Sequence, residues 1–180
     1  ILLKSLNFVQ GVVEKKNTLP ILSNVLLNLK DKKLEIVATD LDIVFYDEIT
    51  ELNITEEGST TTSANVLFDI LRKIPQNADI NFTKKNENKL SLKTENSDFN
   101  LLCLPTTNFP TFNDNFENEK IEIDKTKFLS LLNKTKISIS NDDTRHYLNG
   151  IYLHLTEAQN RTFLTAVATD SHRLSSSSIE

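Results

Sequence analysis

The chain has 180 residues and a hydrophobic content of 38%, with ten Phe and no Trp, which favours a packed core over disorder. It has three Gly and neither of the glycine-rich phosphate-binding patterns GxGxxG and GxxxxGKS/T. The net charge of −5 argues against a tight, nonspecific nucleic-acid binder, but it permits a protein that gathers basic groups on one surface.

The single cysteine, Cys103, excludes a disulfide within the chain, as is usual in a reducing cytoplasm. It lies in the apolar run 101–104, so we expect a buried thiol. The sequence has no secretory signal and no apolar stretch of about 18 residues, so we expect a cytoplasmic protein without membrane contact. The chain does not begin with Met, and we expect it to be part of a longer protein.

Two helices are predicted in the first part of the chain. Apolar residues recur at helical spacing from Leu2 to Val13 and predict an amphipathic helix over 2–13. A second helix is expected over 64–74, with Ser63 as its N-cap and a proline after its end. The predicted strands of this part are residues 21–29, 34–38, 41–49, 59–62, 80–83, 89–94 and 99–104.

Residues 105–120 combine prolines, asparagines and an acidic run, and we interpret them as a linker between two domains. The pattern then begins again. The sequence predicts a short strand at 121–123, a helix at 127–136, and strands at 149–155 and 162–168.

The two parts of the chain match in register, which indicates an internal duplication. The Ala-Thr-Asp sequence at 38–40 recurs at 168–170 after a longer hairpin turn. Because both copies place an Asp at the same strand end, we interpret Asp40 and Asp170 as architectural residues whose carboxylates accept turn N–H groups. Three leucine pairs support the duplication, because the members of each pair are 126 positions apart: Leu3 with Leu129, Leu27 with Leu153, and Leu29 with Leu155.

The same region also allows catalytic hypotheses. Asp40, Asp42, Asp170 and His172 together could bind a hard cation and activate water, as in a metal-dependent hydrolase. A nucleophilic Ser171 is disfavoured, because sequence neighbours rarely form a triad and no GxSxG pattern occurs. A further alternative is a repeat-built interaction domain without a DNA role.

Basic residues gather on the predicted helices and in the loops that follow them. They could contact nucleic acid, or they could only complement the helix dipoles. An aromatic side chain next to an arginine in a loop could stack on a base or sugar. The residues are Lys15, Lys16, Arg72, Lys73, Lys134 and Lys136, together with Arg145, His146 and Tyr147.

A candidate peptide-docking site follows the second Ala-Thr-Asp. Leu174 and the aliphatic stem of Arg173 could form the wall of an apolar pocket. Thr169, Ser171 and His172 could bond to the backbone of a ligand. The alternative is an ordinary turn at the end of a strand.

Four segments carry a resemblance to a known family. They are T-L-P-I-L-S-N at 18–24, L-P-T-T-N-F-P at 104–110, R-H-Y-L-N-G at 145–150 and A-T-D-S-H-R-L at 168–174. In order and spacing they resemble the motifs of bacterial beta sliding clamps, the beta subunit of DNA polymerase III, along essentially the whole chain.

The resemblance implies an α+β fold, the DNA clamp fold, in which each copy of a repeated clamp domain packs two helices on antiparallel sheets. Residues 1–117 would form a first clamp domain without its first strand, and residues 118–180 the first half of a truncated second one. In this family two subunits close into a ring around duplex DNA, with helices lining the hole and sheets forming the outer wall.

The implied function is that of a DNA-encircling sliding clamp, which gives processivity to the replicative DNA polymerase and is no enzyme. The implied partners are double-stranded DNA, the polymerase catalytic subunit, the clamp loader, repair proteins with clamp-binding motifs, and a second subunit in a homodimer of the full-length protein. No cofactor and no metal are expected.

The family's functional residues fall on two groups of positions. The implied DNA contacts are Lys16, Arg72, Arg145, His146 and Tyr147, where His146 replaces a Tyr of the family motif. The implied docking cleft for partner peptides contains Thr169, Ser171, His172, Arg173 and Leu174. Ser171 replaces a Gly there, which makes the backbone less free.

Overall fold

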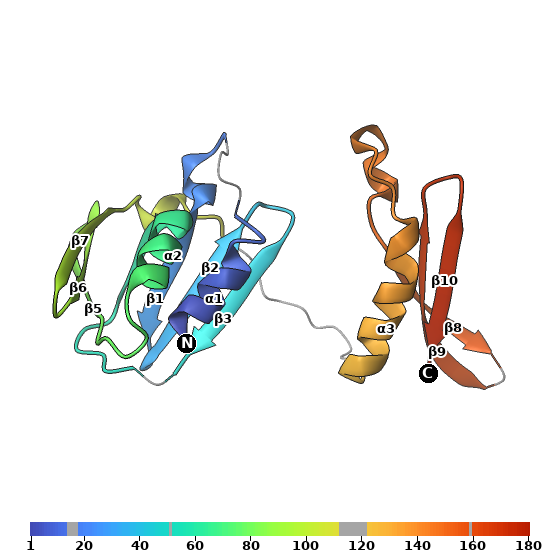
Figure 1. Ribbon diagram of the computed structural model, residues 1–180, viewed down its shortest axis with the longest axis horizontal. Helices are drawn as coiled ribbons and strands as arrows, with labels where there is room; N and C mark the ends of the chain where they lie inside the picture. The colour runs from blue at the N-terminus through green and yellow to red at the C-terminus, as the bar shows by residue number, and fades with distance from the viewer. Residues whose placement is uncertain (14–17, 51, 112–121, 159) are drawn as a thin grey trace. The chain divides into compact units, whose positions relative to one another are not determined.

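The computed structural model describes residues 1–13, 18–50, 52–111, 122–158 and 160–180. The chain divides into two compact units, Ile1–Asp114 and Asn115–Glu180, each shown in Figure 1. Both combine helices with antiparallel strands, so the predicted α+β class is confirmed. The predicted domain boundary between residues 117 and 118 lies outside the described residues.

The first unit contains a four-stranded and a three-stranded antiparallel sheet, with strand orders β3-β2-β1-β4 and β5-β6-β7. The helices α1 and α2 lie side by side across one face of the larger sheet (Figure 1). The elements of this unit are α1 Leu2–Val9, the 3₁₀ helix η1 Pro20–Ser23, β1 Asn24–Lys30, β2 Lys33–Thr39, β3 Val44–Ile49, β4 Gly58–Ser63, α2 Ala64–Lys73, β5 Asn81–Asn86, β6 Lys89–Thr94, β7 Ser97–Leu102 and η2 Thr106–Asn108.

The core of the first unit is formed by the apolar stripes of the two helices on the strands below them. Leu6 and Leu67 are fully buried from the helices, and Val25 and Ile36 are fully buried from β1 and β2. Each such side chain contributes about 1.5–3 kcal/mol relative to an exposed position. Cys103 is buried in the same cluster, as predicted.

Helix α2 agrees closely with its prediction, because the Ser63 hydroxyl accepts the backbone N–H of Val66 (3.4 Å) and caps the helix. Helix α1 ends earlier than predicted. Beyond Val9 the N–H groups of Gly11 and Val12 donate to carbonyls three residues back, so the chain tightens and leaves the α-helix.

Two predicted strands of the first unit begin three residues later than expected. Residues 20–23 form η1, since a proline at the first position favours a helical turn, and β1 therefore starts at Asn24. Strand β3 starts at Val44 because Leu41 has a φ of 85° and belongs to a tight turn. The turn between β1 and β2 has φ of 51° and 61° at Asp31 and Lys32, as in a type I′ hairpin.

The second unit repeats the beginning of the first. Its sheet has the order β10-β9-β8, which corresponds to β3-β2-β1, and α3 corresponds to α1. Asp124 caps α3 by accepting the N–H of Lys127 (2.9 Å), so this helix starts before the predicted position. Its elements are α3 Lys125–Thr135, η3 Lys136–Ser138, η4 Asp143–Leu148, β8 Tyr152–Ala158, β9 Arg161–Thr169 and β10 Leu174–Ile179.

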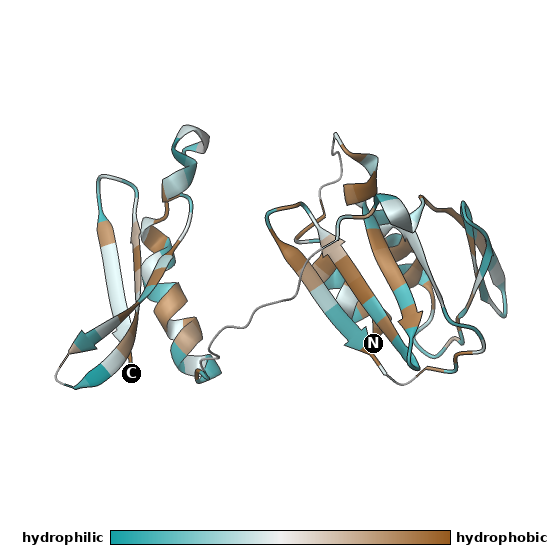
Figure 2. Ribbon diagram, turned by 180° about the vertical axis from the view of Figure 1, so that it is seen from behind, coloured by the Kyte–Doolittle hydropathy of each residue, from teal (hydrophilic) through white to brown (hydrophobic). Residues whose placement is uncertain are grey.

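In the second unit, one predicted strand is not observed in its described residues, and one observed strand was not predicted. Residues 122 and 123 are not in a strand, and residue 121 of the predicted strand lies outside the described residues. Strand β10 was not predicted, because Ser175–Ser178 shows no alternation of apolar and polar residues. In Figure 2 this strand has the pale colour of intermediate hydropathy. Register pairing with β9 and a hydroxyl contact between Ser138 and Ser175 (2.6 Å) hold it in place.

The described part of the predicted linker packs on the first unit. Phe109 follows η2 and is buried against Ile21 and Leu22 of η1. Residues 105–109 therefore belong to the first unit rather than to a free connection.

Candidate functional site

Both units end a strand in the same turn. In the first, Oδ1 of Asp40 accepts the backbone N–H groups of Asp42 (3.0 Å) and Ile43 (2.7 Å). In the second, Oδ1 of Asp170 accepts those of His172 (3.0 Å) and Arg173 (2.9 Å). The architectural interpretation of the two aspartates is thus confirmed.

A threonine and a left-handed residue complete each turn. The Thr39 hydroxyl accepts the N–H of Leu41 (2.9 Å), and the Thr169 hydroxyl accepts the N–H of Ser171 (3.1 Å). Leu41 and Ser171 have φ of 85° and 78°, a region that glycine adopts without strain. The Gly-to-Ser replacement therefore falls on a residue whose backbone is strained.

The second turn carries additional polar contacts. Nε of Arg173 donates to Oδ2 of Asp170 (2.9 Å), and the Thr169 hydroxyl donates to the carbonyl of Arg173 (2.8 Å). The backbone N–H groups of Arg173 and His172, with the Arg173 guanidinium, lower the pKa of Asp170 to about 2. The acid is therefore ionised at neutral pH.

The turn between β9 and β10, residues 169–174, collects all five residues of the predicted docking site. Leu174 opens β10 and is 65% exposed, and His172 is exposed beside it. The Thr169 hydroxyl is engaged within the turn, whereas His172 and Leu174 present a polar and an apolar group to the outside. We call residues 169–174 the docking turn.

The loop with Arg145, His146 and Tyr147 forms η4, whose start is capped by Asp142. Oδ1 of Asp142 accepts the N–H (3.0 Å) and the hydroxyl (2.6 Å) of Thr144, and Oδ2 accepts Nε of Arg145 (2.9 Å). These donors, Thr144 first, lower the pKa of Asp142. Tyr147 is 74% exposed, so its ring is accessible for stacking.

One hydrogen bond connects the two predicted sites of this unit. Nη1 of Arg145 donates to Oγ of Ser171 at 3.0 Å. Residues assigned to DNA contact and to peptide docking are therefore direct neighbours, which their separation in the sequence does not indicate.

Arg72 lies in the first unit, near the end of α2. Its exposed guanidinium pairs with Asp69 (3.2 Å) and lies 5.7 Å from the centre of the Phe68 ring. These contacts hold the cation at the surface. Lys15 and Lys16 lie outside the described residues.

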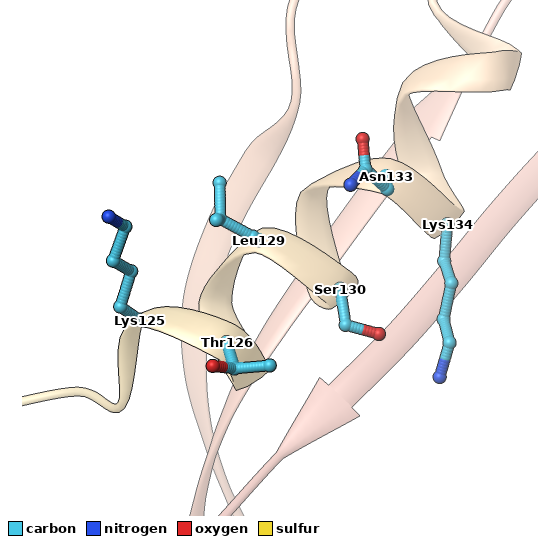
Figure 3. A pocket seen from close by; sticks show the side chains of 6 residues that line it. All are labelled: Lys125, Thr126, Leu129, Ser130, Asn133 and Lys134. Carbon is cyan, nitrogen blue, oxygen red and sulfur yellow. The ribbon is translucent and has the colours of Figure 1, made fainter.

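The solvent-exposed side of α3 is a further candidate surface for DNA contact, and it has an open hollow bordered by lysines (Figure 3). It lies away from Leu131 and Thr135, the buried side of the helix. Lys134 was singled out from the sequence, but Lys125 was missed because the helix was expected to start at residue 127. The hollow is lined by Lys125, Thr126, Leu129, Ser130, Asn133 and Lys134.

The hydrolase hypothesis gains no support. The carboxylates of Asp40 and Asp170 bind the amides of their own turns, and the two residues belong to different units. Across the described ranges, the structure contains no group of three or more His, Cys, Asp or Glu residues arranged to hold a metal ion. Nor is any helix in the described ranges long and apolar enough to cross a membrane.

Comparison with known proteins gives a consistent result for both units. Residues 1–113 match the family model of the N-terminal domain of the DNA polymerase III beta subunit, and residues 122–180 match that of its central domain. The beta sliding clamp of Caulobacter vibrioides is 40% identical over 175 residues, covering 96% of this chain and 46% of that protein. That of Rickettsia felis is 38% identical over 174 residues, covering 97% and 44%.

Comparison with solved structures points to the same family. The Caulobacter crescentus beta sliding clamp superposes with a TM-score of 0.93 at 40% identity, over 99% of this chain and 47% of that one. The DNA polymerase III subunit beta of Pseudomonas aeruginosa gives 0.89 at 34% identity, over 99% and 47%. The chain thus spans about half the length of the relatives it matches.

Proposed function

The chain belongs to the DNA polymerase III beta subunit family, the beta sliding clamps, and we propose that its whole protein encircles duplex DNA and gives processivity to the replicative polymerase. The observation that carries this proposal is the match of both units, in order, to the first two domains of the family. The role is mechanical and non-catalytic, in a cytoplasmic protein whose full-length subunits pair as a homodimer.

DNA contact in this proposal is electrostatic. Cations for the DNA phosphates come from four side chains: Lys125 and Lys134 on the solvent-exposed side of α3, Arg72 on α2, and Arg145 in η4. Such contacts hold a duplex without reading its base sequence, so a ring closed around the DNA remains free to slide along it. Glu35 and Glu48 face each other across β2 and β3, and Glu48 pairs with Lys33 (2.7 Å). Partial desolvation of the Tyr46 hydroxyl, followed by these two carboxylates, raises the pKa of Tyr46.

Partner proteins dock at the docking turn. The exposed Leu174 offers an apolar contact, and His172 and the Ser171 hydroxyl offer hydrogen bonds to an extended peptide. We propose that the polymerase catalytic subunit, the clamp loader and repair proteins bind here through short linear motifs.

Primer extension by the cognate polymerase and clamp loader tests this function. Adding the full-length protein should lengthen the products made in one binding event, with a competitor DNA present to capture released polymerase. A product length that does not change would contradict the proposed role.

A further inference from the structure

Ser171 and Arg145 form a bond that bridges two proposed contact surfaces. The guanidinium of Arg145 donates through Nε to Asp142 at 2.9 Å and through Nη1 to Ser171 at 3.0 Å. One bond fixes it to its own loop and the other to the docking turn. The guanidinium has further N–H groups that neither bond uses.

We propose that Ser171 is a positioning residue, whose hydroxyl holds the Arg145 guanidinium in place for a DNA phosphate and links that contact to peptide docking. The inference rests on the proposed function and deepens it. A side chain that is fixed before binding loses less conformational freedom when the phosphate arrives, so the bond favours DNA contact.

The same hydroxyl provides the link to the peptide. While Oγ of Ser171 accepts from Arg145, its O–H remains a donor and can bind a peptide carbonyl at the docking turn. Hydrogen bonds in a chain strengthen one another, so a docked peptide should tighten the hold on Arg145. The coupling between peptide and DNA is therefore positive, and it is reciprocal.

The chain supplies a matched control. Leu41 occupies the position of Ser171 in the first turn, with a φ of 85° against 78°, and has no hydroxyl. Leu41→Gly therefore changes the same kind of backbone position in the first unit without removing a hydroxyl. Ser171→Ala removes the hydroxyl and keeps the strain, whereas Ser171→Gly removes the hydroxyl and relieves the strain.

The first test measures the affinity of the full-length protein for a short duplex DNA over a range of salt. Arg145→Ala should lower the slope of log K against log salt by about 1. Both Ser171→Ala and Ser171→Gly should weaken binding about threefold, and neither should have an effect in the Arg145→Ala background. Leu41→Gly should bind as the wild type does.

Several outcomes would overturn the inference. They are additive losses from Arg145 and Ser171, a loss with Ser171→Ala but not with Ser171→Gly, and an equal loss with Leu41→Gly. If Arg145→Ala leaves DNA binding unchanged, its proposed DNA role fails and the inference with it.

A second measurement separates positioning from DNA binding. In full-length protein with labelled arginine, hydrogen exchange at Nη1 of Arg145, the group that donates to Ser171, should be slower in the wild type than in either Ser171 variant, without DNA present. Equal exchange would contradict the positioning role even where DNA binding holds. Slower exchange together with an absence of all DNA binding would instead contradict the proposed function.

Discussion

Asp40 and Asp170 accept the same pair of backbone hydrogen bonds, from the residues two and three positions further along the chain. The duplicated unit thus keeps its turn and varies what the turn carries. The first copy carries Leu41, and the second carries Ser171 with its bond to Arg145.

Removing the Asp170 carboxylate should destabilise the second unit. Asp170→Ala leaves the amides of His172 and Arg173 without their acceptor, so the midpoint of thermal unfolding should fall. Asp170→Asn keeps a carbonyl acceptor and should cost less. Asp42→Ala is the control, because Asp42 contributes its backbone N–H to the first turn. Circular dichroism would follow unfolding, and an unchanged midpoint for Asp170→Ala would count against the turn's importance.

The same carboxylate should make stability depend on acid pH. Its pKa falls from 3.8 to about 2 on folding, so the folded state favours the ionised form. The stabilisation is therefore complete above pH 4 and is lost as the pH falls through about 2. Urea unfolding at several pH values should show a weaker acid dependence in Asp170→Asn than in the wild type. Identical pH profiles would contradict this assignment.

Basic residues on the helices should contribute to the salt dependence of DNA binding. Arg72→Ala and Lys134→Ala should each lower the slope of log K against log salt by about 0.9. Lys93→Ala is the control, because Lys93 lies on strand β6 rather than on a helix and, like Arg72, pairs with a neighbouring carboxylate, Asp98 (2.8 Å). A slope that falls equally for Lys93→Ala would indicate a general charge effect rather than a contact surface.

Leu174 should carry much of the peptide affinity. Leu174→Ala removes about 1.5 kcal/mol of apolar burial in the complex, so a polymerase tail peptide should bind about tenfold more weakly by calorimetry. Val44→Ala is the matched control, because Val44 opens β3 as Leu174 opens β10 and is also exposed. His172→Ala should also weaken binding of the peptide, without changing the loading of the protein onto DNA. An unchanged peptide affinity in Leu174→Ala would exclude the docking turn as the binding site of the peptide.

Periodicity and duplication were enough to predict most of the fold. The stripe that begins at Leu2 and the Ser63 cap are local features, so the sequence displays them directly. Strand β10 escaped prediction because its serines are held by pairing with β9, which is a tertiary effect. The early end of α1 depends on hydrogen bonds that shift at Gly11, and residue spacing does not reveal such a shift.

The site was partly predictable for the same reason. The five residues proposed for peptide docking lie in one short segment, so the sequence shows them together. The bond between Arg145 and Ser171 joins η4 to the end of β9 and needs the folded unit to form. Leu27 and Leu153 are equivalent in the repeat yet 6% and 42% exposed, because no counterpart of β4 or α2 covers Leu153 within residues 122–158 and 160–180. Equivalence in sequence therefore does not imply equal burial.

Topological retention tests the central claim most directly. The full-length protein would be loaded by its clamp loader onto a nicked circular DNA, and the circle would then be cut at one site. A clamp that encircles the duplex stays bound to the closed circle through gel filtration and is released from the linear product. Equal retention before and after cutting would show binding by contact alone, and would contradict the sliding-clamp account.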